Sequence, residues 1–240
     1  LKEENIMFAI FINVITAPGE TFETIINKFN WKQALVPVGV LMGLAMITGF
    51  ILQDLIADLQ WEQIQKSIEG NAKISEEQKE TILSSQYNRV YSTSIFNYLS
   101  IAITWPLRIS LWSLFAMLAA NLFLGGGKKY SEMFTLSAFA YMPSVIEYIT
   151  ITPIQYISEN MMIFTGLGAL GIGEPGDFMN SFLAGMDIFA FWRVFLTAVG
   201  IGILYHKSTK TALTVMTGLW IFGLLFLSGF GSVMSSMIGK

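Results

Sequence analysis

The stretch MDIFAFWRVFLTAVGIGILYHK, residues 186–207, decides the fold. It holds about 20 mostly apolar residues, which is the length that an α-helix needs to cross the hydrocarbon core of a bilayer. Asp187 stands at its start and Arg193 lies one to two turns deeper, while Lys207 and Lys210 mark its other end. A charge inside a span costs at least about 2.5 kcal/mol on insertion scales, so it usually faces protein or water and has a partner. The partner of Arg193 therefore decides how the other spans pack.

The composition is typical of a membrane protein. Of the 240 residues, 53% are hydrophobic and only 13% are charged, whereas average soluble domains have about 25% charged residues. The net charge of −3 gives no sign of nucleic-acid binding. The chain has no cysteine and a single histidine, His206, so neither a disulfide framework nor a histidine-based metal site is expected. We therefore assign no metal, no cofactor and no nucleic-acid partner.

Further apolar segments predict an all-α integral membrane protein, with a bundle of five transmembrane helices over residues 33–235. The expected spans are 33–52, 95–124, 130–151, 186–206 and 211–233. Pro106 lies inside the second span and Pro143 inside the third. A proline inside a helix removes a backbone hydrogen bond and kinks the helix. The lipid bilayer is thus the first expected partner of the chain.

Two more polar regions flank the first span. Residues 1–32 predict an interfacial N-terminal segment, in which a short amphipathic helix lies on the bilayer. Its apolar residues repeat at helical spacing: Phe22, Ile25, Ile26 and Phe29. Residues 53–94 are polar and predict a helical hairpin outside the membrane. Ser75 and Gln78 have the spacing of a capping box, which indicates where the second helix of the hairpin begins.

Small residues mark one face of the first span. Gly39 and Gly43 form a GxxxG step, and Ala45 and Gly49 repeat the spacing. Small residues let helix backbones approach closely in lipid. This face either pairs with a second copy of the chain or another membrane protein, or it packs within the bundle.

Basic residues near the span ends predict the orientation, because cytoplasmic loops carry an excess of Lys and Arg. A cytoplasmic N-terminus places seven lysines on that side: Lys2, Lys28, Lys32, Lys128, Lys129, Lys207 and Lys210. The connection over residues 151–186 has no Lys or Arg. We therefore predict a multi-pass protein of the cytoplasmic (inner) membrane.

Four charged residues lie inside the expected spans: Arg108, Glu147, Asp187 and Arg193. At about 1.5 Å per residue, each lies roughly 20–28 Å from the cytoplasmic end of its span, in the outer half of a core of about 30 Å. Asp187 and Arg193 are six residues apart and do not share a helix face. Pairs between helices are expected instead, such as Arg108 with Glu147. The set is either a polar site for an ion, a proton or a lipid headgroup, or a group of ion pairs that fixes which helices are neighbours.

The sequence GLGALG, residues 166–171, formally matches the GxGxxG pattern of dinucleotide-binding proteins. That pattern binds a nucleotide only between a strand and a helix of a βαβ unit, and neither is visible here. We interpret the segment as a glycine-rich loop, either interfacial or re-entrant.

Three stretches together resemble a known family. They are APGETFETI (residues 17–25), GGGKKYSEMFTLSAFAYMP (125–143) and DIFAFWR (187–193). They are similar, in order, to the Yip domain family, named after Ypt/Rab-interacting proteins, and the chain looks like its bacterial branch. The DLYGP-type and GY motifs of eukaryotic members are not found. The resemblance implies a five-helix bundle in the cytoplasmic membrane, and it implies no chemistry.

Three classes of function are compatible with the sequence to different degrees. The first is a non-enzymatic scaffold, assembly or trafficking-like factor, which the resemblance and the GxxxG step favour. The alternative is a small transporter, channel or lipid-handling protein with a polar site at the four intramembrane charges, since broken helices beside polar residues are typical of transporter sites. An intramembrane enzyme has the least support: HExxH is absent, and Ser228 and His206 are expected at different depths. No catalytic residues are assigned.

Overall fold

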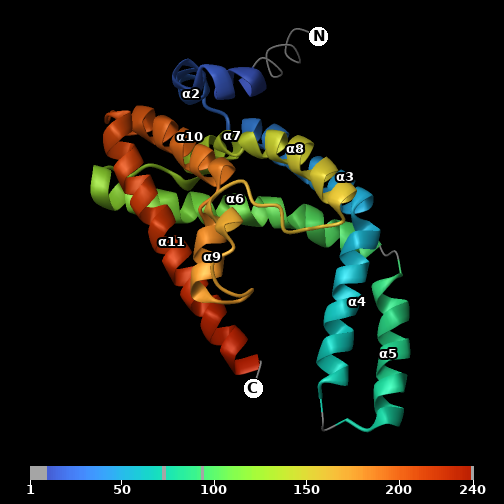
Figure 1. Cartoon of the computed structure of the whole chain (residues 1–240). Coiled ribbons are helices and arrows are strands. Elements are labelled where there is room, and N and C mark those ends of the chain that lie inside the picture. The colour runs from blue at the N-terminus through green and yellow to red at the C-terminus, as the bar shows by residue number, and fades with distance from the viewer. Residues whose placement is uncertain (1–9, 72–73, 93–94, 239–240) are drawn as a thin grey trace.

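A computed structural model describes residues 10–71, 74–92 and 95–238, and these residues form helices joined by loops (Figure 1). Residues 10–16 are helical, and the elements that follow are α2 (Pro18–Asn27), η1 (Trp31–Ala34), α3 (Leu35–Ile51), α4 (Gln53–Glu69), α5 (Glu76–Val90), α6 (Ile95–Leu124), α7 (Tyr130–Ala140), α8 (Pro143–Ser158), η2 (Leu167–Leu170), α9 (Phe178–Gly185), α10 (Ile188–Leu204) and α11 (Thr209–Ile238).

Four segments of the described chain are long and apolar enough to cross a bilayer: Trp31–Ile51, Tyr98–Leu124, Tyr130–Ser158 and Thr209–Met237. The chain is therefore a multi-pass membrane protein. α6 has the bounds of the second expected span, residues 95–124, and continues through Pro106 without a break. α10 is apolar but has 17 residues, so it is about 26 Å long and shorter than a core of about 30 Å.

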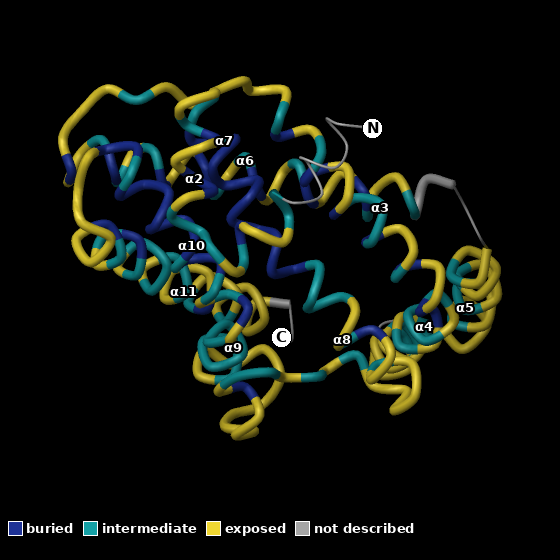
Figure 2. The backbone as a smooth tube through the Cα atoms, turned by 90° about the horizontal axis from the view of Figure 1, so that it is seen from above, coloured by how far each residue is buried: buried dark blue, intermediate teal, exposed yellow. Residues whose placement is uncertain are grey.

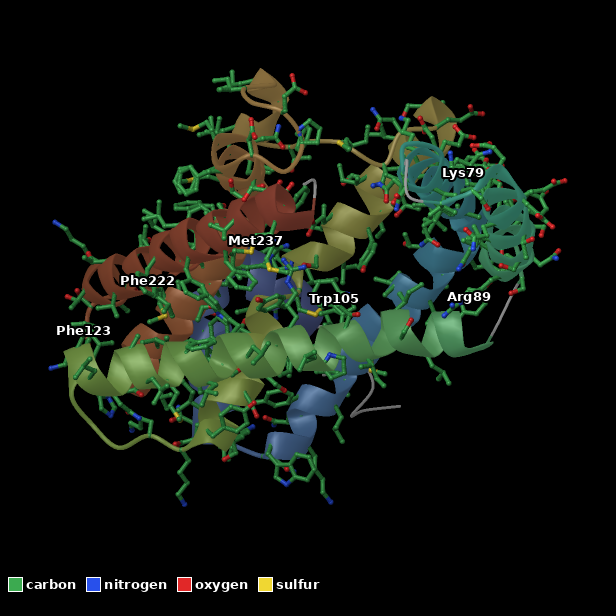
Figure 3. The ribbon with its side chains drawn as sticks, turned by 90° about the horizontal axis from the view of Figure 1, so that it is seen from below. Lys79, Arg89, Trp105, Phe123, Phe222 and Met237 are labelled. Carbon is green, nitrogen blue, oxygen red and sulfur yellow. The ribbon has the colours of Figure 1, made fainter. Side chains whose placement is uncertain are left out.

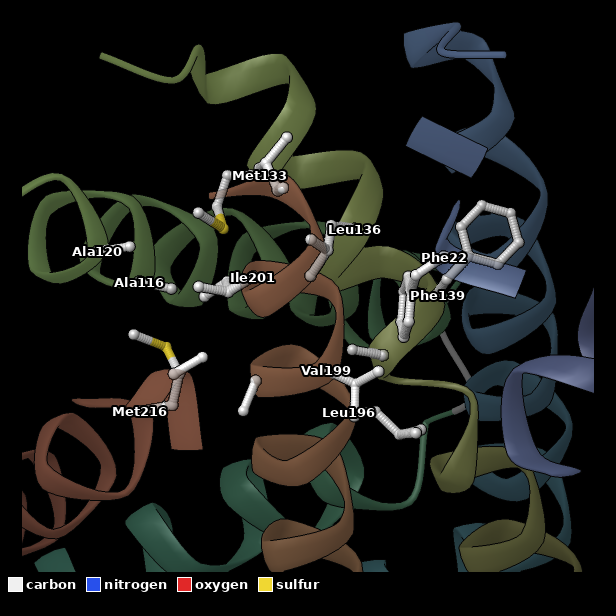
Figure 4. Packing of buried hydrophobic residues seen from close by; sticks show 14 of the residues in the cluster. Phe22, Ala116, Ala120, Met133, Leu136, Phe139, Leu196, Val199, Ile201 and Met216 are labelled. Carbon is white, nitrogen blue, oxygen red and sulfur yellow. The ribbon is translucent and has the colours of Figure 1, made fainter. Parts of the chain in front are cut away.

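α10 lies at the centre of the packing, although it is the shortest of these apolar segments. It contacts α2, α7, α8 and α11, and eleven of its 17 residues are buried. Figure 2 shows that buried backbone gathers around α10, α7 and α6. Leu196 and Ile201 of α10 pack in the same cluster as Leu136 of α7 (Figure 4). Gly200 lets the two helices approach, because a Cβ atom there would lie 2.6 Å from Cγ of Leu136.

The amphipathic helix near the N-terminus has the expected apolar face, and protein covers part of it. Phe22 and Ile25 of α2 are 0% and 2% exposed, and they join the main core together with Val14. α2 contacts α10 and α7. Phe22 and Ile25 of the expected apolar face therefore pack against the bundle, whereas Phe29 is 40% exposed. The pattern reports which side of a helix avoids water, but not what covers that side.

The two pairs of small residues on α3, Gly39 with Gly43 and Ala45 with Gly49, have different surroundings. Ala45 is 2% exposed, in one cluster with Ile109 of α6, and a Cβ at Gly49 would lie 2.8 Å from Cδ1 of Ile101. A Cβ added at Gly39 or Gly43, in contrast, would meet nothing within 4 Å. One step thus packs α3 on α6, while the other faces out of the chain.

The polar helices α4 and α5 lie side by side, away from the other helices (Figure 1). Ser75 and Gln78 form the predicted capping box at the start of α5. The rings of Trp61 and Tyr87 meet edge to face, with centroids 5.2 Å apart. The hydroxyl of Tyr91 donates to Oδ1 of Asp58 at 2.6 Å. Aromatic and polar contacts thus hold the two helices together.

The third expected span differs from the prediction. Residues 130–151 were expected as one helix with Pro143 inside, but the helix turns at residues 141–142, and Pro143 opens a new helix, α8. Proline suits the first position of a helix because it has no backbone N–H to satisfy there. α8 also continues through Pro153 to Ser158. The break therefore changes the direction in which the side chains of α8 point.

Two loops meet at one end of the bundle. The hydroxyl of Tyr205, at the end of α10, donates to Oδ1 of Asn121 on α6 at 2.7 Å. A Cβ at Gly126, in the α6–α7 loop, would lie 3.6 Å from the ring of Tyr205. Loops 125–129 and 205–208 are therefore neighbours, and both carry lysines: Lys128, Lys129 and Lys207.

Candidate polar site between α6, α8 and α10

Asp187 acts as the N-cap of α10, so its carboxylate has partners other than the arginines. Its Oδ1 accepts the backbone N–H of Ala190 at 2.9 Å, which satisfies one of the open N–H groups at a helix start. Its Oδ2 accepts the hydroxyl of Thr165, and its backbone pairs with Gly166 in an isolated β-bridge. Asp187 therefore anchors the loop before α9 to α10.

Two glycines of the GLGALG segment, Gly166 and Gly168, lie where a larger side chain would clash with neighbouring atoms. A Cβ at Gly166 would lie 2.0 Å from the carbonyl oxygen of Met186, and one at Gly168 would lie 2.5 Å from the ring of Phe164. Both positions therefore exclude a larger side chain. The segment is a loop with a short 3-10 turn, η2, as the absence of a strand pattern before it predicted.

Arg193 is the buried centre of the site. It is 6% exposed, and its Nη1 donates to Oε2 of Glu147 at 2.5 Å and to Oγ of Ser144 at 3.0 Å. Its guanidinium also lies 5.7 Å from the ring centroid of Tyr141. Ser144 and Glu147 are three residues apart on α8, so they lie on one helix face. The turn before Pro143 aims that face at α10.

An arginine–carboxylate pair thus joins two helices, but its members are not those expected. The structure pairs Glu147 with Arg193, and Arg108 lies on the exposed side of α6. The guanidinium of Arg108 lies 5.5 Å from the ring centroid of Trp105, one turn earlier on the same helix. Helix depth alone predicted four interacting charges, whereas the rotation of each helix decides which of them meet.

Aromatic side chains connect the two arginines. Nε1 of Trp105 donates to the hydroxyl of Tyr148 at 2.8 Å. The ring centroid of Trp105 lies 5.9 Å from that of Tyr148 and 5.9 Å from that of Tyr141. Figure 3 shows Trp105 midway along α6. The site is therefore a polar and aromatic cluster, with the Arg193–Glu147 ion pair on one side and the exposed Arg108 on the other.

A second polar link joins α6 to α10. Nε1 of Trp112 donates to Oγ1 of Thr197 at 3.2 Å, and Thr197 donates to the backbone oxygen of Arg193 at 2.8 Å. Together with the bond between Trp105 and Tyr148, these bonds satisfy the polar ends of large side chains away from water, where an unpaired group is costly.

Sequence reasoning missed the neutral members of the cluster: Trp105, Tyr141, Ser144 and Tyr148. Their spacing carried a signal, because Trp105 stands three residues before Arg108, and Tyr148 stands four after Ser144. Residues three or four apart share a helix face. Polar and aromatic side chains that share a face with an intramembrane charge could therefore have been assigned to the site together with it.

The site can hold charge, but it has no arrangement typical of a nucleophile with its base. Among the described residues, no group of three or more His, Asp or Glu side chains is placed to hold a metal ion. The site's chemistry lies in its hydrogen-bond donors: two guanidinium groups, one of them exposed, and the hydroxyl of Tyr148. Such donors bind anions.

One comparison with known proteins gives a match. The model of the Yip1 domain family matches residues 12–230, which include α2, the polar pair α4–α5 and the apolar segments, the last of them only as far as residue 230. No curated protein matches the chain, and no solved structure matches it.

Proposed function

Because the chain belongs to the Yip1 domain family, we propose that it is a non-enzymatic membrane scaffold that assembles through the outward face of α3. The observation that carries this proposal is the open space at Gly39 and Gly43. The glycine step matches the small-xxx-small pattern by which helices associate closely in lipid. The other small residues of α3 are already used against α6, so the outward step is free for a second helix.

The residues beyond the glycines extend this face along α3. Met46 and Phe50 are 36% and 62% exposed, and the positions 39, 43, 46 and 50 follow the spacing of a helix–helix seam. The occupant we propose is the same face of a second copy. The Arg193–Glu147 ion pair, which joins α10 to α8, supports a structural use of these two charges within each copy.

The test compares two pairs of glycines that both face open space. Gly39→Leu with Gly43→Leu should turn a dimer into a monomer, because the larger side chains hold the two backbones apart. Gly218→Leu with Gly223→Leu, on α11, is the matched control, since a Cβ at either position also meets nothing within 4 Å. Mass measurement in lipid nanodiscs reports the outcome. A monomeric wild type, or an equal loss in the control, would contradict the proposal.

We also propose five crossings, with α10 as the fourth. The loops 125–129 and 205–208 contact each other, so a chain that leaves this end through α7 and α8 returns to it through α10. The buried environment of α10 supports this, because a helix covered by protein need not match the full thickness of the lipid core. α4 and α5 then form a hairpin outside the bilayer, as their polar surfaces suggest.

The lysines of the two adjoining loops support a cytoplasmic location for that end, in a bacterial inner membrane, with the N-terminus on the same side. A reporter fused after Lys207 should read cytoplasmic, and one in the turn at residues 70–75 should read exterior. The opposite pattern of reporter activities would overturn the orientation while leaving the assembly through α3 untouched.

A further inference from the structure

The polar cluster has more positive than negative charge. It contains two arginines, Arg108 and Arg193, and one carboxylate, Glu147. The other carboxylate expected here, Asp187, caps α10 and binds Thr165. Two cations and one anion leave a formal charge of +1 between α6, α8 and α10. A charge within a membrane segment normally has a counter-charge or a route to water.

Arg108 is the member of the cluster that is open to the outside. It is exposed, and within the described parts of the chain no carboxylate forms an ion pair with it. Two exposed apolar side chains share its face of α6: Leu111 at 48%, three residues further along, and Phe115 at 53%, seven residues further along. These side chains are suited to lipid tails. Arg108 therefore opens sideways, toward the lipid.

A second donor contacts the same tryptophan as the guanidinium. The hydroxyl of Tyr148 accepts the N–H of Trp105, and no hydrogen bond among the described residues uses its own proton. A tyrosine hydroxyl both accepts and donates, so that proton is available to a ligand. Trp105 fixes both groups, because the guanidinium of Arg108 lies over its ring and its N–H holds Tyr148.

The depth of Arg108 suits the headgroup region. It lies ten residues after Tyr98, the start of the apolar segment of α6, which corresponds to about 15 Å. This segment of 27 residues is about 40 Å long, whereas the hydrocarbon core is about 30 Å thick. Part of the 15 Å therefore lies outside the core, and the flexible stem of arginine carries the guanidinium further toward the surface.

We propose that Arg108, Tyr148 and Trp105 form a lateral binding site for the phosphate group of an anionic membrane phospholipid. The planar guanidinium donates two parallel hydrogen bonds to phosphate oxygens, and the hydroxyl of Tyr148 donates a third. The negative charge of the lipid neutralises the excess positive charge of the cluster. The exposed side chains of Leu111 and Phe115, which lie deeper in the core on the same face, receive the acyl chains. This site is independent of the face of α3 proposed for assembly.

The experiment is native mass spectrometry of the whole chain in detergent, with phosphatidylglycerol or phosphatidylcholine added. Wild-type protein should bind phosphatidylglycerol about tenfold more tightly than phosphatidylcholine, because both lipids carry the phosphate but only phosphatidylglycerol has a net negative charge, and one charge pair away from bulk water is worth about one factor of ten or more. Arg108→Gln should remove this preference, and Tyr148→Phe should weaken binding a few-fold. Arg89→Gln, at an exposed arginine on α5, is the control and should bind like the wild type.

Several outcomes would overturn the site. They are an unchanged preference in Arg108→Gln, an equal affinity of the wild type for both lipids, and an equal loss in Arg89→Gln. Displacement of the lipid by inorganic phosphate alone would show a site for a free anion instead of a lipid. Arg108→Lys and Tyr148→Phe keep the test decisive if Arg108→Gln fails to fold, because a lysine retains the charge and should retain part of the preference.

Discussion

Nη1 of Arg193 and Oε2 of Glu147 lie 2.5 Å apart, although 46 residues separate them in the chain. The pair joins α10 to α8, and Ser144 completes it with a bond of 3.0 Å. The side chain of Arg193 is 8% exposed and that of Glu147 is 34% exposed. The arginine thus depends on the carboxylate, whereas the carboxylate retains some access to its surroundings.

Loss of the carboxylate should therefore cost more stability than loss of the whole pair. Glu147→Leu leaves Arg193 buried without a counter-charge, which costs about 3–5 kcal/mol for a buried pair. Glu147→Leu combined with Arg193→Leu removes both charges and should recover part of that loss. Thermal unfolding in detergent, followed by tryptophan fluorescence, measures both variants.

Arg108→Leu is the control for this pair, because Arg108 is exposed and pairs with no carboxylate among the described residues. It should melt within a few degrees of the wild type. A double variant that melts no higher than Glu147→Leu would refute the pairing as the source of the loss.

Gly200 should tolerate no added methyl group. Replacement of glycine by alanine inside a helix normally stabilises by roughly 0.5–1 kcal/mol. At Gly200 the new Cβ would meet three atoms of Leu136 at 2.6–2.9 Å, and overpacking of a core costs about 1–3 kcal/mol. Gly200→Ala should therefore lower the melting temperature, while Gly218→Ala, in open space on α11, should leave it unchanged or raise it. Leu136→Ala should cost less stability in the Gly200→Ala background than in the wild type, because there it also relieves the clash, and equal costs in the two backgrounds would argue against the clash.

His206 should be replaceable by glycine with a gain in stability. α10 ends in a Schellman arrangement, in which Lys207 N–H donates to Gly202 at 2.8 Å and His206 N–H donates to Ile203 at 3.2 Å. His206 has φ of 54° there, and this left-handed backbone costs a non-glycine residue about 1 kcal/mol. His206→Gly should raise the melting temperature, and His206→Ala should not. Equal melting temperatures of the wild type, His206→Gly and His206→Ala would show that the left-handed backbone at His206 costs no measurable stability.

The hydroxyl of Tyr91 should lose its proton at a higher pH than an ordinary tyrosine. Its hydrogen bond to the Asp58 carboxylate raises the pKa of Tyr91 to about 12 from the usual 10.0. A raised pKa means that the folded state holds the phenolic proton more tightly, so this contact stabilises α4 against α5 below pH 10 and is lost as the pH rises through 12. Ultraviolet difference titration of wild type against Tyr91→Phe isolates this residue. Asp58→Asn should return the pKa toward 10, and no change would exclude the carboxylate as the cause.

Local patterns predicted much of the fold. The bounds of α6 and the capping box at Ser75 follow from a long apolar run and from the three-residue spacing of Ser75 and Gln78, both of which act within one helix. The turn before Pro143 was missed because proline is compatible both with a kink and with a new helix start. Tertiary contacts at Tyr141, which packs against Trp105, decide between these options.

The candidate site was harder to predict than the helices. Depth along each span placed Arg108, Glu147, Asp187 and Arg193 in one layer, but depth says nothing about the direction of each side chain. Asp187 precedes the first turn of α10, where an aspartate is a strong N-cap, and this local preference outweighs a distant arginine. The choice of Arg193 over Arg108 depends on how α6 and α10 are rotated against α8, which no local pattern records.

The separation of Glu147 and Arg193 along the chain also bears on biogenesis. Because synthesis proceeds from the N-terminus, α8 enters the membrane with its carboxylate before α10 has been made. When α10 follows, its arginine meets an acceptor that is already at the right depth. An isolated α10 would carry that charge at a cost of about 2.5–3.5 kcal/mol. The chain order thus supplies the acceptor ahead of the donor, and a circular permutation that moved α10 in front of α8 should lower the efficiency of insertion.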